Sequence, residues 1–448
     1  MRCTRRLREK CSASILAVIA MCGALDVLAS CSSSDDTGPS SVDAAAAPDA
    51  MSADATDAAV SLRDAALVDA SPLPVVCASS SCATALVTTF GDYIVNDDGQ
   101  GFCALLHDRT VACWGANVSG QLGRGEEAAA VEGSSTPARV AGLERVVALD
   151  HSCAVDEDGA TWCWGTGPFL QSATNRTTTL RTPVKLALPS ATRVGVSPTV
   201  GCAATGEGVL CWGYNFYGQI APFDTMPRDT WSAPRKLDLP AGAPVRQLAV
   251  GDATFIVRED GSALTLGASP PIGRISSMSP DPYAAVVGLD GISAVDIATD
   301  NACTTAGGIG YCWGAAMPGA VDTLSRAYPK GLVTSDPLVG IATTRTVTSL
   351  AGSQIPYRWC AVTVSGDVDC WGFNESGQAG NGSKDFATDA VRVVGLPERA
   401  VSVKVTRSTS CALLTNGKIY CWGSNFDGQL GNGNNKGLAL IPEEVVLP

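Results

Sequence analysis

The sequence predicts an all-β fold: a seven-bladed β-propeller whose blades each contain four antiparallel strands. Three observations lead to this prediction. A short hairpin unit recurs seven times, its Trp-Gly pair returns with a period of about fifty residues, and two further strand-like runs lie between successive hairpins. A period of this length with several short strands per unit is typical of a propeller rather than of a solenoid.

The clearest copy of the hairpin unit runs from Cys411 to Gly433. Cys411 and Cys421 are symmetrical about Asn416, so a three-residue turn that ends at Gly417 sets the two cysteines opposite each other. Glycine suits the last position of such a turn because it readily adopts a positive φ. Further copies of the unit begin at Cys103, Cys153, Cys202, Phe255, Cys303 and Cys360. In two of them the cysteines are one residue closer, and the central pairs Gly206-Glu207 and Gly307-Gly308 predict two-residue primed turns.

Cysteines placed opposite each other on paired strands come close enough to form a disulfide bond. In the altered fourth copy, Phe255 and Thr265 replace both cysteines together, as expected of a bonded pair. The alternatives are reduced core cysteines and a metal site. Zinc is disfavoured because the pairs lack Cys-x-x-Cys spacing and the chain has only two histidines. The predicted bridges are Cys103–Cys113, Cys153–Cys163, Cys202–Cys211, Cys303–Cys312, Cys360–Cys370 and Cys411–Cys421, with a small local bridge between Cys77 and Cys82.

Residues 1–30 have a basic head followed by an apolar run, which is the pattern of a secretory signal peptide. Their end, Leu28-Ala29-Ser30 followed by Cys31, resembles the lipobox of bacterial lipoproteins. The resemblance implies cleavage before Cys31, acylation at that residue and export to the outer membrane or cell surface. Several acyl chains on one residue would give stable attachment. The alternative is an ordinary cleaved signal with a soluble product.

Residues 31–74 consist mostly of Ala, Asp, Ser and Pro and contain no aromatic residue. Such a segment cannot bury enough apolar surface to offset its ordering entropy, so a disordered tether is predicted. The propeller domain is predicted to span residues 75–448. The run from Ala83 to Val95 precedes the first hairpin, and the run from Pro442 to Leu447 follows the last. Pairing of these N- and C-terminal strands within one blade is predicted to close the ring.

The hairpin motif, His151-Ser152-Cys153 with Gly159 and then Cys163-Trp164-Gly165, is similar to the repeat of the regulator of chromosome condensation propellers. The resemblance covers nearly all of residues 83–448 and implies a seven-bladed propeller with shaft-facing loops. It also implies that the glutamines of the Gly-Gln loops bond between blades: Gln121, Gln219, Gln378 and Gln429. The eukaryotic founder exchanges nucleotide on a small GTPase, and a secreted bacterial relative inhibits a β-lactamase. Function on this scaffold therefore depends on the loops.

The formal net charge of −13 argues against nucleic acid or an anionic lipid surface as the main ligand. We predict no catalytic, cofactor-binding or metal-binding residue. Neither His107 nor His151 has a motif-linked nucleophile. Two acidic loops, Asn96-Asp97-Asp98-Gly99 and Asp156-Glu157-Asp158-Gly159, lack the ligand spacing of a calcium hand.

The insertion after the third hairpin carries the candidate binding residues Phe216, Tyr217, Phe223 and Trp231. The alternative is a loop folded onto its own blade. The leading prediction is a monomeric, exported, lipid-anchored and disulfide-stapled module that binds an unknown protein or glycan and touches the membrane only through its anchor. The alternative is an extracytoplasmic lyase or hydrolase at one mouth of the shaft. Its candidate residues lie at hairpin tips: Asp108, Arg109, Glu259 and Asp260.

Overall fold

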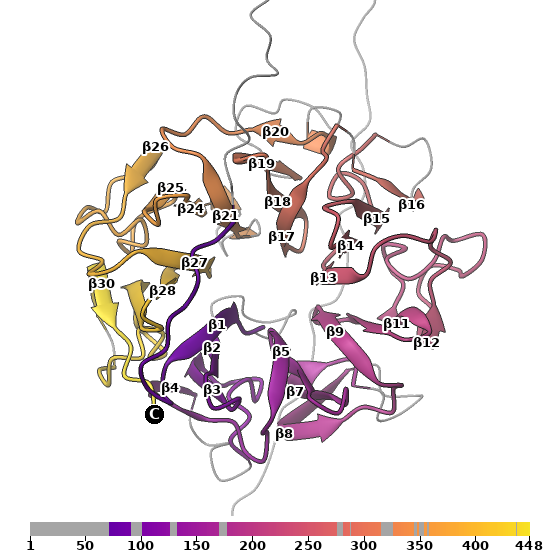
Figure 1. Ribbon diagram of the computed structural model, residues 1–448, viewed down its shortest axis with the longest axis horizontal. Coiled ribbons are helices and arrows are strands. Elements are labelled where there is room, and N and C mark those ends of the chain that lie inside the picture. The colour runs from indigo at the N-terminus through magenta and orange to yellow at the C-terminus, as the bar shows by residue number, and fades with distance from the viewer. Residues whose placement is uncertain are drawn as a thin grey trace, which may run out of the picture. The chain divides into compact units, whose positions relative to one another are not determined.

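The computed structural model describes residues 71–90, 101–125, 132–169, 177–275, 281–286, 288–314, 326–344, 347–348, 354–355, 358–435 and 437–448. The chain divides into two units, Met1–Leu62 and Arg63–Pro448, and every described residue belongs to the second. Within these ranges there are seven four-stranded antiparallel sheets arranged as a ring (Figure 1). The predicted all-β, seven-bladed fold is confirmed. The predicted signal, the lipidation site Cys31 and most of the predicted tether lie outside the described residues.

Each blade is one continuous stretch of chain, and its strands follow one another from the centre of the ring outward (Figure 1). The innermost strands are β1 (Ala83–Thr88), β5 (Val146–Asp150), β9 (Ala191–Val196), β13 (Val245–Val250), β17 (Ile292–Ala298), β21 (Leu338–Thr343) and β27 (Ala400–Val405). The second strands are β2 (Gly101–Leu106), β6 (Cys153–Asp156), β10 (Val200–Thr205), β14 (Ala253–Arg258), β18 (Asn301–Ala306), β24 (Arg358–Thr363) and β28 (Thr409–Leu414).

The two outer strands of each blade complete the sheet. The third strands are β3 (Val111–Ala116), β7 (Thr161–Gly167), β11 (Gly208–Tyr214), β15 (Ala263–Gly267), β19 (Ile309–Gly314), β25 (Val368–Gly372) and β29 (Ile419–Ser424). The outermost strands are β4 (Gly133–Arg139), β8 (Thr178–Lys185), β12 (Trp231–Lys236), β16 (Asp281–Ala285), β20 (Lys330–Gly331), β26 (Ala387–Arg392) and β30 (Leu438–Glu444). A separate two-stranded hairpin, β22 (Val347–Thr348) and β23 (Gln354–Ile355), lies in the connection between β21 and β24.

The hairpins have the register that the cysteine spacing predicts. Cys411 pairs with Cys421, and Gly417 ends the turn with φ 74°. Leu414 donates its N–H to the carbonyl of Lys418, so alternation along the ladder makes the cysteine pair a non-hydrogen-bonded one, with close Cα atoms. Six hairpins carry a disulfide with a Cα–Cα distance of 4.1 Å: Cys103–Cys113, Cys153–Cys163, Cys202–Cys211, Cys303–Cys312, Cys360–Cys370 and Cys411–Cys421. A further disulfide joins Cys77 and Cys82.

The turns follow the sequence less uniformly. Gly307 and Gly308 both have positive φ, at 57° and 80°, as a primed two-residue turn requires. The same prediction is wrong at Gly206-Glu207, where positive φ falls instead on Gly208, at 120°. In the first hairpin Arg109 occupies the place of the turn glycine and adopts φ 64°. In the fourth blade Phe255 stands opposite Thr265, as aligned.

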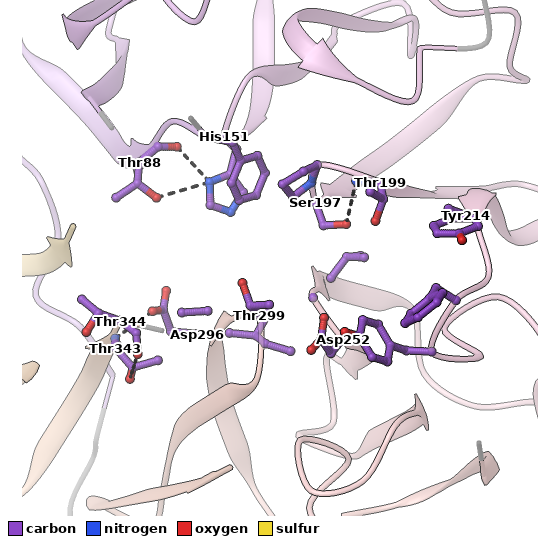
Figure 2. A pocket seen from close by; sticks show the side chains of 18 of the residues that line it. Thr88, His151, Ser197, Thr199, Tyr214, Asp252, Asp296, Thr299, Thr343 and Thr344 are labelled. Carbon is purple, nitrogen blue, oxygen red and sulfur yellow. Dashed lines mark hydrogen bonds between the residues drawn. The ribbon is translucent and has the colours of Figure 1, made fainter. Parts of the chain in front are cut away.

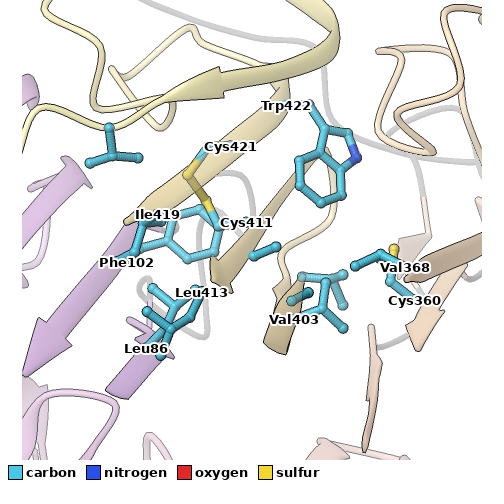
Figure 3. Packing of buried hydrophobic residues seen from close by; sticks show 14 of the residues in the cluster. Leu86, Phe102, Cys360, Val368, Val403, Cys411, Leu413, Ile419, Cys421 and Trp422 are labelled. Carbon is cyan, nitrogen blue, oxygen red and sulfur yellow. A yellow bond between two sulfur atoms is a disulfide. The ribbon is translucent and has the colours of Figure 1, made fainter. Parts of the chain in front are cut away.

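Blades pack face to face, and this covers both sides of most strands. All six residues of β2, β3, β14, β18, β24 and β28 are buried. The apolar cluster around Trp422 and the Cys411–Cys421 disulfide also contains Phe102 of the first blade and Val368 of the sixth (Figure 3). The strands therefore lack a polar face, which explains why their sequences do not alternate.

The ring closes differently from the prediction. β1 pairs with β2, and β30 pairs with β29, so no blade combines the two ends of the domain. The reason is that β30 begins at Leu438, upstream of the predicted run, and completes the seventh blade by itself. Innermost strands contact one another in the order β1, β5, β9, β13, β17, β21, β27 and again β1. Closure therefore rests on packing and on bonds such as that from Trp114 Nε1 to the Gln429 carbonyl, at 2.9 Å.

Candidate functional site

All seven innermost strands end at one face of the ring, around a cavity of about 530 Å³ that we call the mouth cavity. Its lining includes a residue at or just after the end of each of these strands: Thr88, His151, Ser197, Val250, Thr299, Thr343 and Val405. The volume lies within the range of about 300–1,000 Å³ that is typical of ligand sites. The opposite face, which we call the far face, carries the turns between the second and third strands.

The mouth cavity is a slot with two sides (Figure 2). Thr88, His151, Ser197, Thr199 and Tyr214 lie along one side. Asp252, Asp296, Thr299, Thr343 and Thr344 lie along the other. The first side comes from blades one to three and the second from blades four to six, so only a closed ring brings the two together.

Three of the four candidate binding residues lie at this cavity. Phe216, Tyr217 and Trp231 line it together with Tyr214, and we call these four residues the aromatic wall. Tyr214 stacks on Trp231 with ring centroids 5.2 Å apart and an interplanar angle of 12°. The fourth candidate, Phe223, is half-buried and does not line the cavity.

The aromatic wall is held by the loop that joins β11 to β12. Asn215 is fully buried, and its side-chain amide donates to the carbonyl of Ala221 at 2.8 Å. Its side-chain oxygen accepts the N–H of Ile220 at 3.0 Å. Arg228 lies over the ring of Phe216, 3.9 Å from its centroid. The loop is therefore a built structure that presents aromatic side chains to the cavity.

His151 lies in a turn at the edge of the mouth cavity and contributes to its lining. It is the first residue of a two-residue turn between β5 and β6 and has φ 47°. Its Nδ1 lies 2.9 Å from the carbonyl oxygen of Thr88. Because that carbonyl can only accept, Nδ1 is the donor, so Nε2 is the acceptor whenever the ring carries a single proton. The ring also packs on Phe90, with centroids 3.8 Å apart.

A second left-handed residue lines the cavity. Thr299 is the first residue of the two-residue turn between β17 and β18 and has φ 57°. Its carbonyl accepts the N–H of Asp252 at 2.8 Å, which fixes the turn. A positive φ is a genuine outlier for a β-branched residue, and such outliers concentrate at functional sites. Sequence reasoning missed both turns, although two-residue turns without glycine are a signal that could have shown them.

Charged residues occupy equivalent positions along the shaft. The residue opposite the first cysteine of each hairpin, or opposite its replacement Phe255, lies on the innermost strand: Val87, Asp150, Gly195, Ala249, Asp296, Ala342 and Lys404. Asp296 accepts from Lys404 Nζ at 2.7 Å and from the Thr343 amide at 2.9 Å. Although burial alone would lower it, the attraction of Asp296 and of Asp150 raises the pKa of Lys404. Carboxylates of the shaft thus join blades that are far apart in sequence.

The environment of the Asp150 carboxyl is unfavourable to its ionisation. Burial raises its pKa, against the lowering influence of His151, of the Val196 amide and of Lys404. A carboxyl whose pKa rises on folding destabilises the fold once it is ionised. The free energy of unfolding therefore falls as pH rises from the ordinary pKa of 3.8 to the folded value.

Replacing Asp150 by asparagine is expected to stabilise the protein by about 1 kcal/mol at neutral pH, because the amide can still accept from Val196 but carries no charge. The gain should vanish at pH below 3.8, where the native carboxyl is protonated in both states. Urea unfolding of both proteins at pH 7 and pH 3 checks this. A gain that is equal at the two pH values would contradict it.

Asp156 provides the matched control because its shift has the opposite sign. Partial burial would raise its pKa, but hydrogen bonds from Trp162 and from the amides of Ala160 and Asp158 lower it. Its stabilisation is present above the ordinary pKa of 3.8 and is lost as pH falls through the folded value. Asp156→Asn is therefore expected to destabilise at pH 7 by about 1 kcal/mol and to differ less from the native protein in acid.

The candidate residues of the enzyme alternative do not meet. Asp108 and Arg109 belong to the turn between β2 and β3, and Glu259 and Asp260 to that between β14 and β15, so all four lie at the far face. None of them lines the mouth cavity. The Asp156–Gly159 loop is a hairpin turn, whereas the loop at residues 96–99 lies outside the described residues. Among the residues that the structure describes, no group of three His, Cys, Asp or Glu side chains could hold a metal ion. In the same ranges, no helix is both long and apolar enough to cross a bilayer.

The glutamines of the Gly-Gln loops act between blades in two ways. Gln219 and Gln378 donate to carbonyls of the next blade, those of Gly251 and Arg407. The backbone carbonyl of Gln378 accepts the indole N–H of Trp422 at 2.8 Å, and Gln121 and Gln429 accept from tryptophans in the same way. The side-chain oxygens instead close their own loops. The glutamines therefore bond between blades as predicted, but partly through their backbone carbonyls rather than through their side chains.

Comparisons with known proteins agree with this architecture. Two stretches, residues 400–429 and 416–448, match family models described as the regulator of chromosome condensation (RCC1) repeat. The human E3 ubiquitin-protein ligase HERC2 is 28% identical over 352 residues, which is 73% of this chain but 7% of that protein. The ultraviolet-B receptor UVR8 of Arabidopsis thaliana is 26% identical over 362 residues, 76% of this chain and 67% of the receptor. The chain thus carries repeats of the RCC1 type.

Solved structures show the same fold. Human WBSCR16 superposes with a TM-score of 0.62 at 17% identity, covering 76% of this chain and 94% of that one. Yeast RCC1 (Prp20), solved with Kap60 bound, superposes with a TM-score of 0.59 at 18% identity, covering 75% and 83% of the two chains. At these identities the likeness shows the fold alone, and the loops must be interpreted from this chain's own residues.

Proposed function

We propose that this RCC1-type propeller is an exported, lipid-anchored interaction module that binds a protein or glycan partner at the mouth cavity. One observation carries the proposal: the innermost strands of all seven blades end around a single ligand-sized cavity that also has an aromatic wall. Aromatic residues of this kind, on a loop that a rigid scaffold holds, are typical of contact surfaces.

The relatives support a binding role in general terms. In one similar structure yeast RCC1 (Prp20) has Kap60 bound, and a second structure of Prp20p was described together with its binding to Gsp1p and histones. Those partners belong to those proteins. The net charge of −13 disfavours polyanionic partners for this chain. We take from these relatives only that the propeller is a scaffold that presents loops to another molecule.

The first described residues of the chain lie at the far face of the propeller. Val76 donates its N–H to the carbonyl of Thr415, in the turn between β28 and β29 at the far face. The chain therefore enters the propeller at the face opposite the mouth cavity. If Cys31 is acylated, a tether over residues 31–74 with random-coil dimensions would reach about 35–40 Å, which would let the propeller stand off the membrane.

The anchor is tested by Cys31→Ser, which removes the sulfur that would carry the lipid. The variant is expected to shift from the membrane fraction to the soluble fraction and to lose labelling by a clickable palmitate analogue, because no acyl chain remains to hold it. Cys77→Ser is the control, since Cys77 bonds to Cys82 and lies outside the lipobox-like segment. Equal membrane recovery of native protein and Cys31→Ser would contradict the anchor.

The binding face is tested by affinity capture with the oxidised Cys31→Ser chain on membrane and envelope extracts. Phe216→Ser in the aromatic wall should abolish retention of a partner that the native mouth binds, because it removes a large contact side chain. Ile309→Ser is the matched control, as Ile309 is an exposed apolar residue next to the far-face turn at Gly307 and Gly308. A partner retained by Phe216→Ser and lost by Ile309→Ser would place binding on the far face.

A further inference from the structure

We propose that the mouth cavity binds a neutral saccharide chain, with sugar rings against the aromatic wall and sugar hydroxyls bonded to Trp231, His151 and the Thr299 turn. This inference rests on the proposed binding function of the same cavity and names the chemistry of its ligand. Five properties of the cavity lead to it. The charges of its lining balance, and backbone groups on edges of innermost strands are already hydrogen-bonded. Trp231 has an indole donor without a partner in the described part of the chain, His151 has an acceptor at Nε2, and two turns have positive φ at residues other than glycine.

The charges of the lining balance. The lining contains two acids, Asp252 and Asp296, and two bases, Lys404 and Arg407, and Asp296 is bonded to Lys404 at 2.7 Å. The lining has no net charge of opposite sign to a strongly anionic or cationic ligand. The free-energy cost of desolvating such a ligand would therefore not be offset. A neutral ligand fits this lining better.

Addition of a peptide strand is disfavoured at β9, β17 and β21, because side chains of neighbouring blades already bond to edge groups of these innermost strands. Asp150 accepts the N–H of Val196 at 2.9 Å, and Asp296 accepts that of Thr343 at 2.9 Å. Gln247 bonds to both the N–H and the carbonyl of Val295, at 2.9 and 2.6 Å. A peptide that pairs with a sheet needs open backbone groups on the edge strand. Recognition in the cavity therefore falls to side chains.

The side chains of the cavity offer a donor and an acceptor that the protein leaves open. Trp231 Nε1 is buried and has no hydrogen-bond partner among the described residues. His151 is fixed through Nδ1 on Thr88, which leaves Nε2 as an acceptor in the neutral ring. A buried donor without a partner is costly, and a ligand oxygen would relieve that cost. Sugar hydroxyls both donate and accept, and the apolar faces of sugar rings suit aromatic side chains.

The two strained turns also point to the ligand. A two-residue turn that needs positive φ at its first position is ordinarily filled by Gly, Asn or Asp. At the mouth cavity His151 and Thr299 occupy that position, with φ 47° and 57°. Glycine would adopt this positive φ at a lower conformational energy at both positions. We therefore infer that His151 and Thr299 occupy these positions because of their side chains. Both residues have polar side chains, and both line the cavity.

The test is calorimetric titration of the oxidised full chain, carrying Cys31→Ser, with cellotriose, maltotriose and tri-N-acetylchitotriose. Trigalacturonate and trilysine serve as anionic and cationic probes of similar length. At least one neutral trisaccharide is expected to bind about tenfold or more tightly than either charged probe. Trp231→Phe, which removes the indole N–H, and Thr299→Gly should each weaken binding roughly three- to tenfold.

Arg109→Gly is the matched control for Thr299→Gly. Both replace a left-handed residue by glycine, but Arg109 lies in a far-face turn. Both variants should keep or raise the thermal midpoint, and only Thr299→Gly should weaken the saccharide. Preference for a charged probe, failure of all three trisaccharides to bind, or equal affinity of Thr299→Gly and native protein would each overturn the inference. If a protein partner is captured by the native chain and lost in Phe216→Ser while no trisaccharide binds, the proposed binding function is retained and the inference of a saccharide ligand is rejected.

Discussion

Complete reduction of the six hairpin disulfides is expected to unfold the propeller under otherwise native conditions. Each bridge closes a loop with a sequence separation of 9 or 10 residues. By the chain-entropy model each contributes about 2–3 kcal/mol, so six together are on the order of 12–18 kcal/mol before any discount for turns that already close the hairpin. A typical folded domain is stable by only about 5–15 kcal/mol, so the reduced chain has little or no stability left.

The measurement is near-ultraviolet circular dichroism and tryptophan emission with and without a phosphine reductant. Trp114, Trp164, Trp212, Trp313 and Trp422 are fully buried, so unfolding should shift the emission strongly to the red. A single-bridge variant, Cys411→Ala with Cys421→Ala, should lose only about 2–3 kcal/mol and remain folded. A reduced chain with unchanged spectra and an unchanged urea midpoint would show that packing alone holds the ring.

Replacing Arg358 by methionine is expected to destabilise the protein by about 3–5 kcal/mol. Arg358 is fully buried at the start of β24, and its guanidinium reaches into the seventh blade. It donates to the carbonyl of Thr406 at 2.5 Å and to the Ser410 hydroxyl at 2.7 Å, and it also bonds to the carbonyl of Thr409. Methionine would leave these buried acceptors unpaired, and each such loss costs about 1–3 kcal/mol.

Among the described residues no carboxylate forms an ion pair with Arg358, so the loss of its hydrogen bonds to neutral acceptors accounts for the expected destabilisation. Burial lowers the pKa of its guanidinium to about 9, which leaves it charged at neutral pH. Arg139→Met is the matched control: Arg139 is half-exposed, pairs with Asp108 at 2.6 Å and should cost less than about 1 kcal/mol. Urea unfolding measures both variants. Similar losses for the two arginines would contradict an interblade role for Arg358.

Much of the ring could be predicted from the sequence because its unit is local. Symmetry of the cysteines about Asn416, with Gly417 at the end of the turn, determines the register of one hairpin, and the same reasoning holds at each repeat. Closure could not be predicted in this way. The start of β30 at Leu438 depends on its pairing with β29 across a bulge, and no local pattern marks that start.

The mouth cavity was only partly predictable. Phe216, Tyr217 and Trp231 stand out because they are aromatic residues in an insertion. Asp296 and Lys404 could not be paired from sequence, since 108 positions separate them and only the ring brings their strands together. A usable signal was nevertheless present: each is a charged residue inside an otherwise largely apolar strand, opposite the first cysteine of its hairpin. Such a position points to the shaft once the fold is known.

Hydrogen exchange measured by mass spectrometry tests the central claim, that binding occurs at the mouth of the shaft, most directly. The oxidised chain is compared alone, with each neutral trisaccharide and with any partner recovered by affinity capture. We predict slower exchange in peptides that contain the turns at His151 and Thr299 and the loop from Asn215 to Trp231, with no change at the far-face turns around Gly261 and Gly417. Protection confined to those far-face turns, or none at the mouth with any of these ligands, would contradict the account.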